Sequence, residues 1–493
     1  MGRAETEWKF DVDDHAALPT PPGIGVLGDR DLRLEAVYWD TTDLALLSWG
    51  ATLRHRSASD GSELGWTLKL PGTGARGAVT RAEIRVDGGP DAPPPELLGL
   101  TSALTMRATL RPVATVITER RAIRLGAEVG AATVELVDDR VESTVGSQPG
   151  PTFRQVEVEI VDPSDEATVT SVLQALRVGG FDPSIERSKL ARVLQAPRRV
   201  PYPVPKRLPK EATTGDFLAA LIGSATRQLI SNDPAVRIGE DPEGVHQARV
   251  ATRRLRSDIK TFRRLMDPDE VESLRRELGW LGELLGGVRD GQVLVRNLGR
   301  FASEVAFSAD GLTELNDRAT GQVGFRRTLL MSALNGERYF ALLARLARLA
   351  VAPPLREGRR SGKAAAPIVT RMAHRRWRRV EREVADLGSD PSDEDLHEFR
   401  KHVKQLRYAA QSIRLVGADS KRFVRALGRL QDALGEHHDA VVAMSWLSSE
   451  APQLSPRAAF LAGQLHQVAQ DQHRRLSRSW RSRWSDAAAI PFA

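Results

Sequence analysis

The first half of the chain alternates apolar and charged positions in short segments, with the period of two that is typical of β-strands. In Glu5–Phe10, the side chains of Glu5, Glu7 and Lys9 fall on one face of such a strand, opposite Trp8. The same alternation recurs in four later segments, 53–56, 66–70, 81–86 and 156–160. Each polar face carries ionic groups, and over the set both signs occur. Charged side chains in a folded protein require water, partners or a bound ion, so these faces must meet one of the three.

Two architectures are compatible with this alternation. A sheet with one solvated face would carry more Ser, Thr and Gln on its polar side. A closed antiparallel barrel with a charged, water-filled interior and an apolar outside fits better, and closure removes exposed strand edges. We expect helices at 95–110 and 164–178 to cover the apolar side. The sequence therefore favours the barrel, and the solvated sheet remains the alternative.

Proline-rich residues 198–211 separate this half from a second one of different periodicity. Prolines this dense exclude a helix or a central strand and predict a stiff, extended linker. Beyond the linker the apolar period becomes helical, and we expect long helices at 216–230, 242–266, 268–298, 338–350, 393–416 and 422–447. The sequence thus predicts an α+β multidomain chain, with a strand-rich domain at 1–197 and an all-α domain at 212–488.

The helical half repeats itself. Val245–Arg249 recurs as Leu396–Arg400 at an offset of 151 residues (397 − 246), measured between the histidines. The Leu-Gly pattern of Leu278–Asp290 recurs as Leu427–Asp439 at an offset of 149 residues (427 − 278). Two matches in order at nearly one offset indicate a duplicated helical bundle. The predicted copies are 212–352 and 366–488.

Each copy carries one basic helix face. The residues at i, i+3, i+7 and i+10 are His246, Arg249, Arg253 and Arg256 in the first copy, and His397, Arg400, Lys404 and Arg407 in the second. This spacing places each set of four within an arc of about 80°. Like charges this close disfavour a helix unless an anion shields them, so we expect anion-binding faces, with a solvated basic face as the alternative. The adjacent His437 and His438 point apart on a helix, and we do not expect them to share a metal ion.

Composition narrows the classes of function. The 493 residues carry a formal net charge of +7 and no cysteine, which excludes disulfide scaffolds, thiolate metal sites and cysteine nucleophiles. No apolar run is long enough to cross a bilayer and no signal peptide is evident, so we expect a cytoplasmic protein without a membrane partner. Few aromatic residues accompany the basic faces, which argues against nucleic acid as a partner.

The ordered motifs of the first half resemble the CYTH superfamily, the triphosphate tunnel metalloenzymes. The first is Glu5-x-Glu7-x-Lys9, and the others follow in order: Tyr38–Asp43, Arg54-x-Arg56, Lys69, Arg81 with Glu83, Arg120, Glu135 with Asp139, Glu157 with Glu159, and Ser188-Lys189. The resemblance implies an eight-stranded antiparallel barrel whose interior binds a linear triphosphate and a divalent metal ion. Mg²⁺ or Mn²⁺ is the expected cofactor, because both prefer carboxylate oxygens.

The same resemblance implies roles for individual residues. The expected metal ligands are Glu5, Glu7, Asp139, Glu157 and Glu159, although Asp139 could instead orient the basic residues. The expected triphosphate ligands are Lys9, Arg54, Arg56, Lys69, Arg81, Arg120 and Lys189, and Lys9, Arg56 and Lys69 are the expected catalytic residues. Arg120 is preferred over Arg121 because it alternates with Thr118. A second metal ion would activate the attacking water, because no side-chain general base is evident.

The second half resembles the CHAD domain, a helical domain associated with binding inorganic polyphosphate in a basic groove between its halves. One departure is Arg289, which stands where the second copy has His438. Together the resemblances imply an inorganic triphosphatase coupled to a polyphosphate-binding domain. Two alternatives stay open: a non-catalytic polyphosphate-binding adaptor, and a tunnel enzyme that acts on an organic triphosphate such as thiamine triphosphate or a nucleotide.

Overall fold

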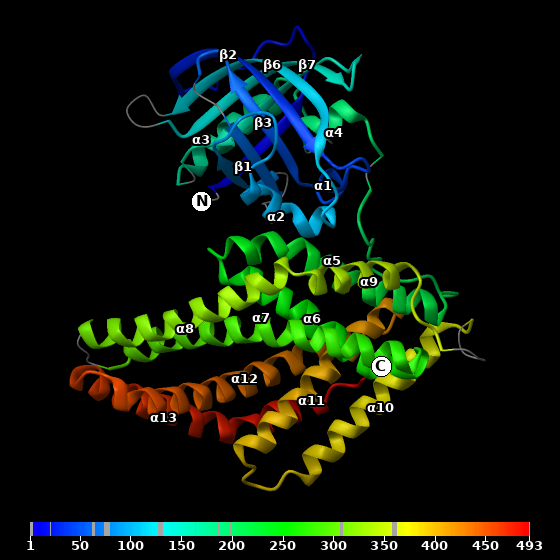
Figure 1. The fold of residues 1–493 in the computed structure, drawn as a ribbon, viewed down its shortest axis with the longest axis vertical. Coiled ribbons are helices and arrows are strands. Elements are labelled where there is room, and N and C mark those ends of the chain that lie inside the picture. The colour runs from blue at the N-terminus through cyan, green and yellow to red at the C-terminus, as the bar shows by residue number, and fades with distance from the viewer. Residues whose placement is uncertain are drawn as a thin grey trace. The chain divides into compact units, whose positions relative to one another are not determined.

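The computed structural model describes residues 3–19, 21–61, 65–72, 79–126, 132–162, 164–184, 188–197, 199–305, 309–356 and 362–492, with side chains omitted at 3–5, 79 and 80 (Figure 1). The chain divides into two compact units, Met1–Pro201 and Tyr202–Ala493. The first unit contains an antiparallel sheet and the second is helical. The mixed α+β character predicted from the two periodicities is confirmed.

The first unit is built on antiparallel strands. The main ones are β1 (Arg3–Asp11), β2 (Gly25–Asp40), β3 (Thr52–Ala58), β4 (Gly65–Pro71), β5 (Val79–Val86), β6 (Arg111–Gly126), β7 (Val134–Val145) and β9 (Phe153–Ile160). Two short ones are β8 (Gln148–Pro149) and β10 (Asp182–Pro183). The hydrogen-bonded order is β10-β1-β5-β4-β3-β2-β6-β7-β8, and β9 pairs with both β1 and β7. Strands far apart in sequence thereby become neighbours.

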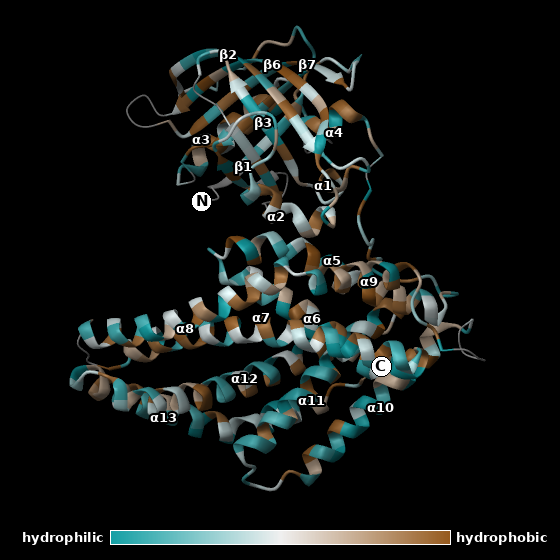
Figure 2. Cartoon of the chain, viewed as in Figure 1, coloured by the Kyte–Doolittle hydropathy of each residue, from teal (hydrophilic) through white to brown (hydrophobic). Residues whose placement is uncertain are grey.

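One face of the sheet is apolar and is covered by helices. Phe10, Val156 and Val158 pack against Val172 and Leu176 of α3 (Glu166–Val178). Burial of these side chains explains why one face of each strand reads as apolar. Figure 2 shows brown and teal residues alternating along these strands.

The two covering helices begin close to where the sequence predicts. Helix α3 begins after Asp165, whose side chain accepts a hydrogen bond from the Thr168 amide at 3.0 Å. Helix α2 (Pro95–Thr105) ends earlier than the predicted residue 110. The reason is that Met106 and Arg107 have positive φ angles of 52° and 61°, which an α-helix cannot contain. Two further short helices are α1 (Ala45–Ser48) and α4 (Lys189–Leu194).

The second unit is a bundle of long helices. They are α5 (Thr214–Ile238), α6 (Pro242–Phe262), α7 (Pro268–Ala302), α8 (Ala309–Asn335), α9 (Glu337–Val351), α10 (Ala365–Asp386), α11 (Asp393–Ser412), α12 (Lys421–Glu450) and α13 (Pro456–Ala488). Helix α6 packs on α7, and α11 packs on α12 in the same way; α6 and α11 contact each other. Among the described residues, no helix combines the length and apolar character needed to span a bilayer.

The long helices match the predicted segments, with differences at their ends. The predicted segments 242–266 and 393–416 end in 3₁₀ turns, Arg263–Leu265 and Ile413–Val416, rather than continuing as α-helix. Helices α8, α10 and α13 were not predicted. In α10 the run Arg375–Arg379 masks the apolar stripe, since only a few of its residues, including Val369 and Val380, are fully buried.

Candidate functional site

The centre of the sheet unit holds a buried cluster of alternating charges. Lys9 on β1 lies directly opposite Glu157 on β9 and donates a hydrogen bond to its Oε1. Lys189, the first residue of α4, approaches the same Oε1 at 2.6 Å. Glu157 is only 2% exposed. Although burial alone would raise the pKa of Glu157, the two lysines hold it well below its usual value, so the carboxylate stays ionised.

Arg120 and Asp139 extend the cluster across two more strands. These residues are register partners on β6 and β7, and the Nε and Nη2 of Arg120 each donate to a different Asp139 oxygen at 2.9 Å. Asp139 also accepts from Lys189 at 2.8 Å. Arg121, the alternative in the sequence, is exposed and pairs with Asp29 on the other side of the sheet. Arg120 therefore lies with the buried charges and Arg121 does not.

Three carboxylates of this cluster could hold a metal ion. One oxygen from each of Glu7, Glu157 and Glu159 lies within 4.8 Å of the other two. Glu7 and Glu159 are register partners on β1 and β9, which explains their proximity. Glu7 Oε2 lies 3.1 Å from Lys9 Nζ, while its buried Oε1 has no hydrogen-bond partner among the described residues. An all-oxygen set with one unpartnered carboxylate oxygen fits a hard divalent cation.

The other predicted tunnel residues come from β3, β4 and β5. Lys69 Nζ lies 3.1 Å from Glu83 Oε2, and the two are register partners. Arg56 and Arg81 are buried. Arg54 donates to the Tyr38 hydroxyl at 3.3 Å, and the side chain of Glu5 lies outside the described residues.

Two further buried residues belong with this face but were not among the predicted site residues. Gln155 lies two positions before Glu157 on β9 and is fully buried, yet neither polar atom of its amide has a partner among the described residues. The pKa of Tyr38 is lowered: burial raises it, but Arg54 and Lys189 outweigh that effect. The signal that could have found Gln155 is its alternation with Glu157; Tyr38 is the register partner of Arg54, which only the strand pairing reveals.

In the helical unit, the two predicted basic faces come together. The pKa of Lys404 on α11 is lowered to about 6, by burial first and then by the nearby cations Arg400, Arg253 and Arg249. Arg249 and Arg253 belong to α6, so charges from both copies converge here. Arg253 donates to the Tyr408 hydroxyl at 3.0 Å, and Asp439 is the nearby carboxylate.

The same contacts are made in both copies. The Arg249 guanidinium lies against Gly286 and pairs with Asp290 at 3.0 Å; Arg400 lies against Gly435. A Cβ at either glycine would lie 3.5 Å from a guanidinium nitrogen. Arg256 and Arg407 lie in the same way against Gly279 and Gly428. The glycines thus make room for arginine side chains, where the sequence had suggested close helix packing.

The predicted histidines lie at the edges of this surface. Burial, followed by repulsion from Arg289, lowers the pKa of His246. His397 lies beside His438, with their Nδ1 atoms 3.1 Å apart. His437 points elsewhere, toward Asp393, in agreement with the expectation that the adjacent histidines diverge.

Comparison with known proteins places both halves in described families. The family model of the CYTH domain matches residues 3–182, and that of the CHAD domain matches residues 220–448. A Mycobacterium tuberculosis protein described as uncharacterised is 31% identical over 480 residues, covering 91% of this chain and 88% of its own length.

Solved structures resemble the helical part. The CHAD domain from the plant Ricinus communis is 26% identical, covers 58% of this chain and 95% of its own, and has a TM-score of 0.49. PptA from Streptomyces chartreusis is 22% identical, covers 56% of this chain and 100% of its own, and has a TM-score of 0.47.

The CYTH superfamily consists of metal-dependent enzymes that act on triphosphates, as hydrolases or cyclases, and CHAD domains are associated with polyphosphate. Both domain models match in this one chain, in the order expected from the motifs, and the mycobacterial relative aligns across nearly its whole length. The chain belongs to the family of proteins in which a CYTH domain is fused to a CHAD domain.

Proposed function

We propose that the sheet unit hydrolyses inorganic triphosphate with a divalent metal ion, and that the helical unit binds inorganic polyphosphate. The observation that carries the proposal is the buried cluster in which Glu7, Lys9, Glu157 and Lys189 meet. Buried ion pairs are a poor source of stability, because desolvation offsets their attraction. A cluster of this size is better explained by a ligand of mixed charge, such as a metal triphosphate.

A tunnel is supported by the strand pairing. Because β9 pairs with both β1 and β7, antiparallel pairs lead from β1 through β5, β4, β3, β2, β6, β7 and β9 back to β1. We propose that residues 1–197 form this tunnel domain, in line with the closed eight-stranded barrel expected from the sequence. The charged face would then line the interior, where the low dielectric strengthens contacts with phosphate.

The triphosphate would exchange places with carboxylates as the partner of the basic side chains. Lys9 and Lys189 are now held by Glu157, and Arg120 is held by Asp139. Phosphate oxygens offer the same acceptor geometry, and arginine can contact them in pairs. The proposed substrate ligands are Lys9, Arg54, Arg56, Lys69, Arg81, Arg120 and Lys189. We assign to Lys9, Arg56 and Lys69 the stabilisation of charge in the transition state.

Glu7, Glu157 and Glu159 would hold the metal ion, which supplies charge neutralisation and an activated water when bound. Mg²⁺ or Mn²⁺ suits these oxygen ligands. We propose that Asp139 orients Arg120 and Lys189, because both contact it directly. Phosphoryl transfer needs mainly positioning and electrostatic stabilisation, and the side chains of this cluster can provide both.

In the helical unit, the polyphosphate ligands would be the two basic faces, which comprise His246, Arg249, Arg253, Arg256, His397, Arg400, Lys404 and Arg407. The convergence of Arg249 and Arg253 with Arg400 and Lys404 supports this proposal, since a polyanion would relieve their repulsion. Residues 212–352 and 366–488 would be the two copies. Residues 198–211 would link the units and raise the effective concentration of polymer ends near the tunnel.

The test measures phosphate release from tripolyphosphate, long-chain polyphosphate, ATP and thiamine triphosphate, with Mg²⁺ and with Mn²⁺. We expect tripolyphosphate to give the highest kcat/KM, and Glu7→Gln to reduce it by about 100-fold or more. The matched control is Glu119→Gln on β6, where the carboxylate is exposed and pairs with Arg33.

The other readings have distinct outcomes. Preference for ATP or thiamine triphosphate would replace the inorganic substrate by an organic one. Polyphosphate binding without phosphate release from any of the four compounds would make the chain a binding adaptor. Equal activity of Glu7→Gln and the unchanged protein would remove the buried cluster from the mechanism.

A further inference from the structure

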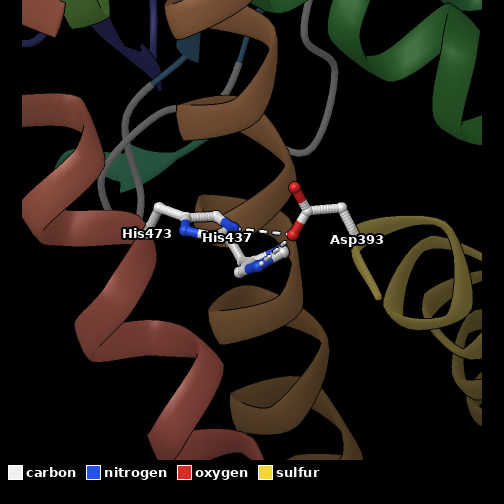
Figure 3. Close-up of side chains that lie close together, drawn as sticks. All are labelled: Asp393, His437 and His473. Atoms are coloured by element: carbon white, nitrogen blue, oxygen red, sulfur yellow. Dashed lines mark hydrogen bonds and ion pairs between the residues drawn. The ribbon is translucent and has the colours of Figure 1, made fainter. Parts of the chain in front are cut away.

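Three helices of the second unit bring one carboxylate and two imidazoles to a single point. Asp393 is the first residue of α11, His437 lies within α12, and His473 lies within α13 (Figure 3). His473 Nε2 lies 2.6 Å and His437 Nε2 lies 3.3 Å from the same oxygen, Asp393 Oδ1. The close-up shows both rings directed at this carboxylate from neighbouring helices.

The three groups are in a state that can bind a cation. His437 is buried, and burial together with repulsion from His473 lowers its pKa to about 4, so its imidazole is neutral near pH 7. Ser477 Oγ lies 3.0 Å from His437 Nε2 and donates its hydrogen to the His473 carbonyl oxygen, so its oxygen acts only as an acceptor toward the ring. Asp393 and His473 are partly exposed, which gives solvent and ions access to the point where the groups meet.

The spacing fits a small tetrahedral site. Zinc binds imidazole nitrogen and carboxylate oxygen at about 2.0–2.2 Å, which places neighbouring ligands roughly 3.3 Å apart. The separation between His437 Nε2 and Asp393 Oδ1 already has this value, at 3.3 Å. The contact between His473 and Asp393 is a hydrogen bond and must lengthen by about 0.7 Å to reach it. A rotation of the partly exposed Asp393 carboxylate is sufficient for a shift of this size.

We propose that Asp393, His437 and His473 form a binding site for Zn²⁺, with water as the fourth ligand. Two imidazoles and one carboxylate favour zinc or a similar transition metal over Mg²⁺, which prefers oxygen alone. The site is separate from the carboxylate cluster of the sheet unit, which provides only oxygen ligands. It is also separate from the His397–His438 pair, because His438 points away from His437 toward α11.

The site is present in one copy of the repeat and not in the other. At the repeat offsets, Pro242 and Val288 of the first copy correspond to Asp393 and His437, and neither side chain can bind a metal (393 − 151 and 437 − 149). Zinc would therefore tie the beginning of α11 to α12 and α13 in the second copy alone. Helix α11 also carries Arg400 and Lys404, so the ion would fix the end of the helix that presents these cations.

The experiment uses the full-length chain without an affinity tag, stripped of metal and titrated with Co²⁺ as a spectroscopic probe for Zn²⁺. Tetrahedral Co²⁺ absorbs visible light far more strongly than octahedral Co²⁺, which distinguishes this site from an oxygen-only site. We expect one equivalent of strongly absorbing Co²⁺, displaced by Zn²⁺. His473→Ala and Asp393→Asn should lower the affinity by about 100-fold or more, because removing even an outer partner of a ligand costs 10–100-fold.

The matched control is His466→Ala, seven residues before His473 on the same helix. It should keep the spectrum and the stoichiometry. Zn²⁺ should also raise the melting temperature of the unchanged protein and of His466→Ala, but not that of His473→Ala, since binding to the native state alone stabilises it. Circular dichroism of each metal-free variant separates loss of the site from loss of the fold.

Two results would overturn the proposal. One is a metal-free protein that binds Co²⁺ with only the weak octahedral spectrum, which would reduce the three residues to a hydrogen-bonded set. The other is an identical spectrum and affinity in His473→Ala, which would place the ion elsewhere. Neither result depends on phosphate release, so the zinc site stands or falls independently of the proposed activity.

Discussion

Binding of a polyanion to the helical unit should take up a proton at Lys404. Burial and the neighbouring arginines lower the pKa of this lysine to about 6. At pH 8 the free protein therefore has only about 1% of this side chain charged. A bound polyphosphate would replace repulsion by attraction and return the pKa toward its ordinary value of about 10.4.

The magnitude follows from the size of this shift. Full recovery over about 4 pKa units corresponds to ~6 kcal/mol between the two protonation states. Uptake should approach one proton per site at pH 8 and fall toward zero at pH 5, where Lys404 is already charged. Linkage then makes the association constant fall about tenfold per pH unit between roughly pH 7 and pH 9. The histidines of the basic faces contribute little above pH 8, because burial lowers the pKa of His246 and of His397.

Isothermal titration calorimetry measures this uptake directly when the same titration is run in buffers of different ionisation enthalpy. Long-chain polyphosphate is the ligand of choice, because its few terminal groups add little to the proton balance. Lys404→Met should abolish the uptake. Lys401→Met is the matched control, since Lys401 lies on the same helix, is exposed and pairs with Glu398 at 2.6 Å. Zero uptake at pH 8, or equal uptake in Lys404→Met, would refute the reasoning.

Three other predictions concern both units. Arg121→Ala should leave triphosphate hydrolysis within about twofold, whereas Arg120→Ala should reduce kcat/KM by about 100-fold, because only Arg120 faces the buried cluster. Arg253→Glu with Lys404→Glu should weaken polyphosphate binding, lower its salt dependence by about one unit per lost contact and spare hydrolysis, as measured by titration at several salt concentrations. Burial raises the pKa of Asp258 from 3.8 to about 6, so the native state binds more protons than the unfolded state between these values and stability falls as pH rises. Asp258→Asn should therefore raise the free energy of unfolding by up to about 3 kcal/mol at pH 7.5 and by little at pH 4, as measured by urea denaturation.

Local periodicity in the sequence determined which residues share a face. The alternation in Val156–Ile160 placed Glu157 and Glu159 together, and the helical spacing placed Arg400 and Lys404 on one side of α11. These relations hold within one strand or one helix, because the backbone geometry of each element fixes the direction of neighbouring side chains. The change of period after the linker likewise separated the strand-rich half from the helical half.

Only the tertiary structure decided which faces meet. Lys9 lies opposite Glu157 because β1 and β9 pair across nearly 150 residues of sequence, and no local pattern encodes that register. The joining of Asp393, His437 and His473 depends in the same way on how three helices pack. Sequence spacing reports the short-range geometry of the backbone, whereas contacts between elements depend on the burial of apolar surface over the whole unit.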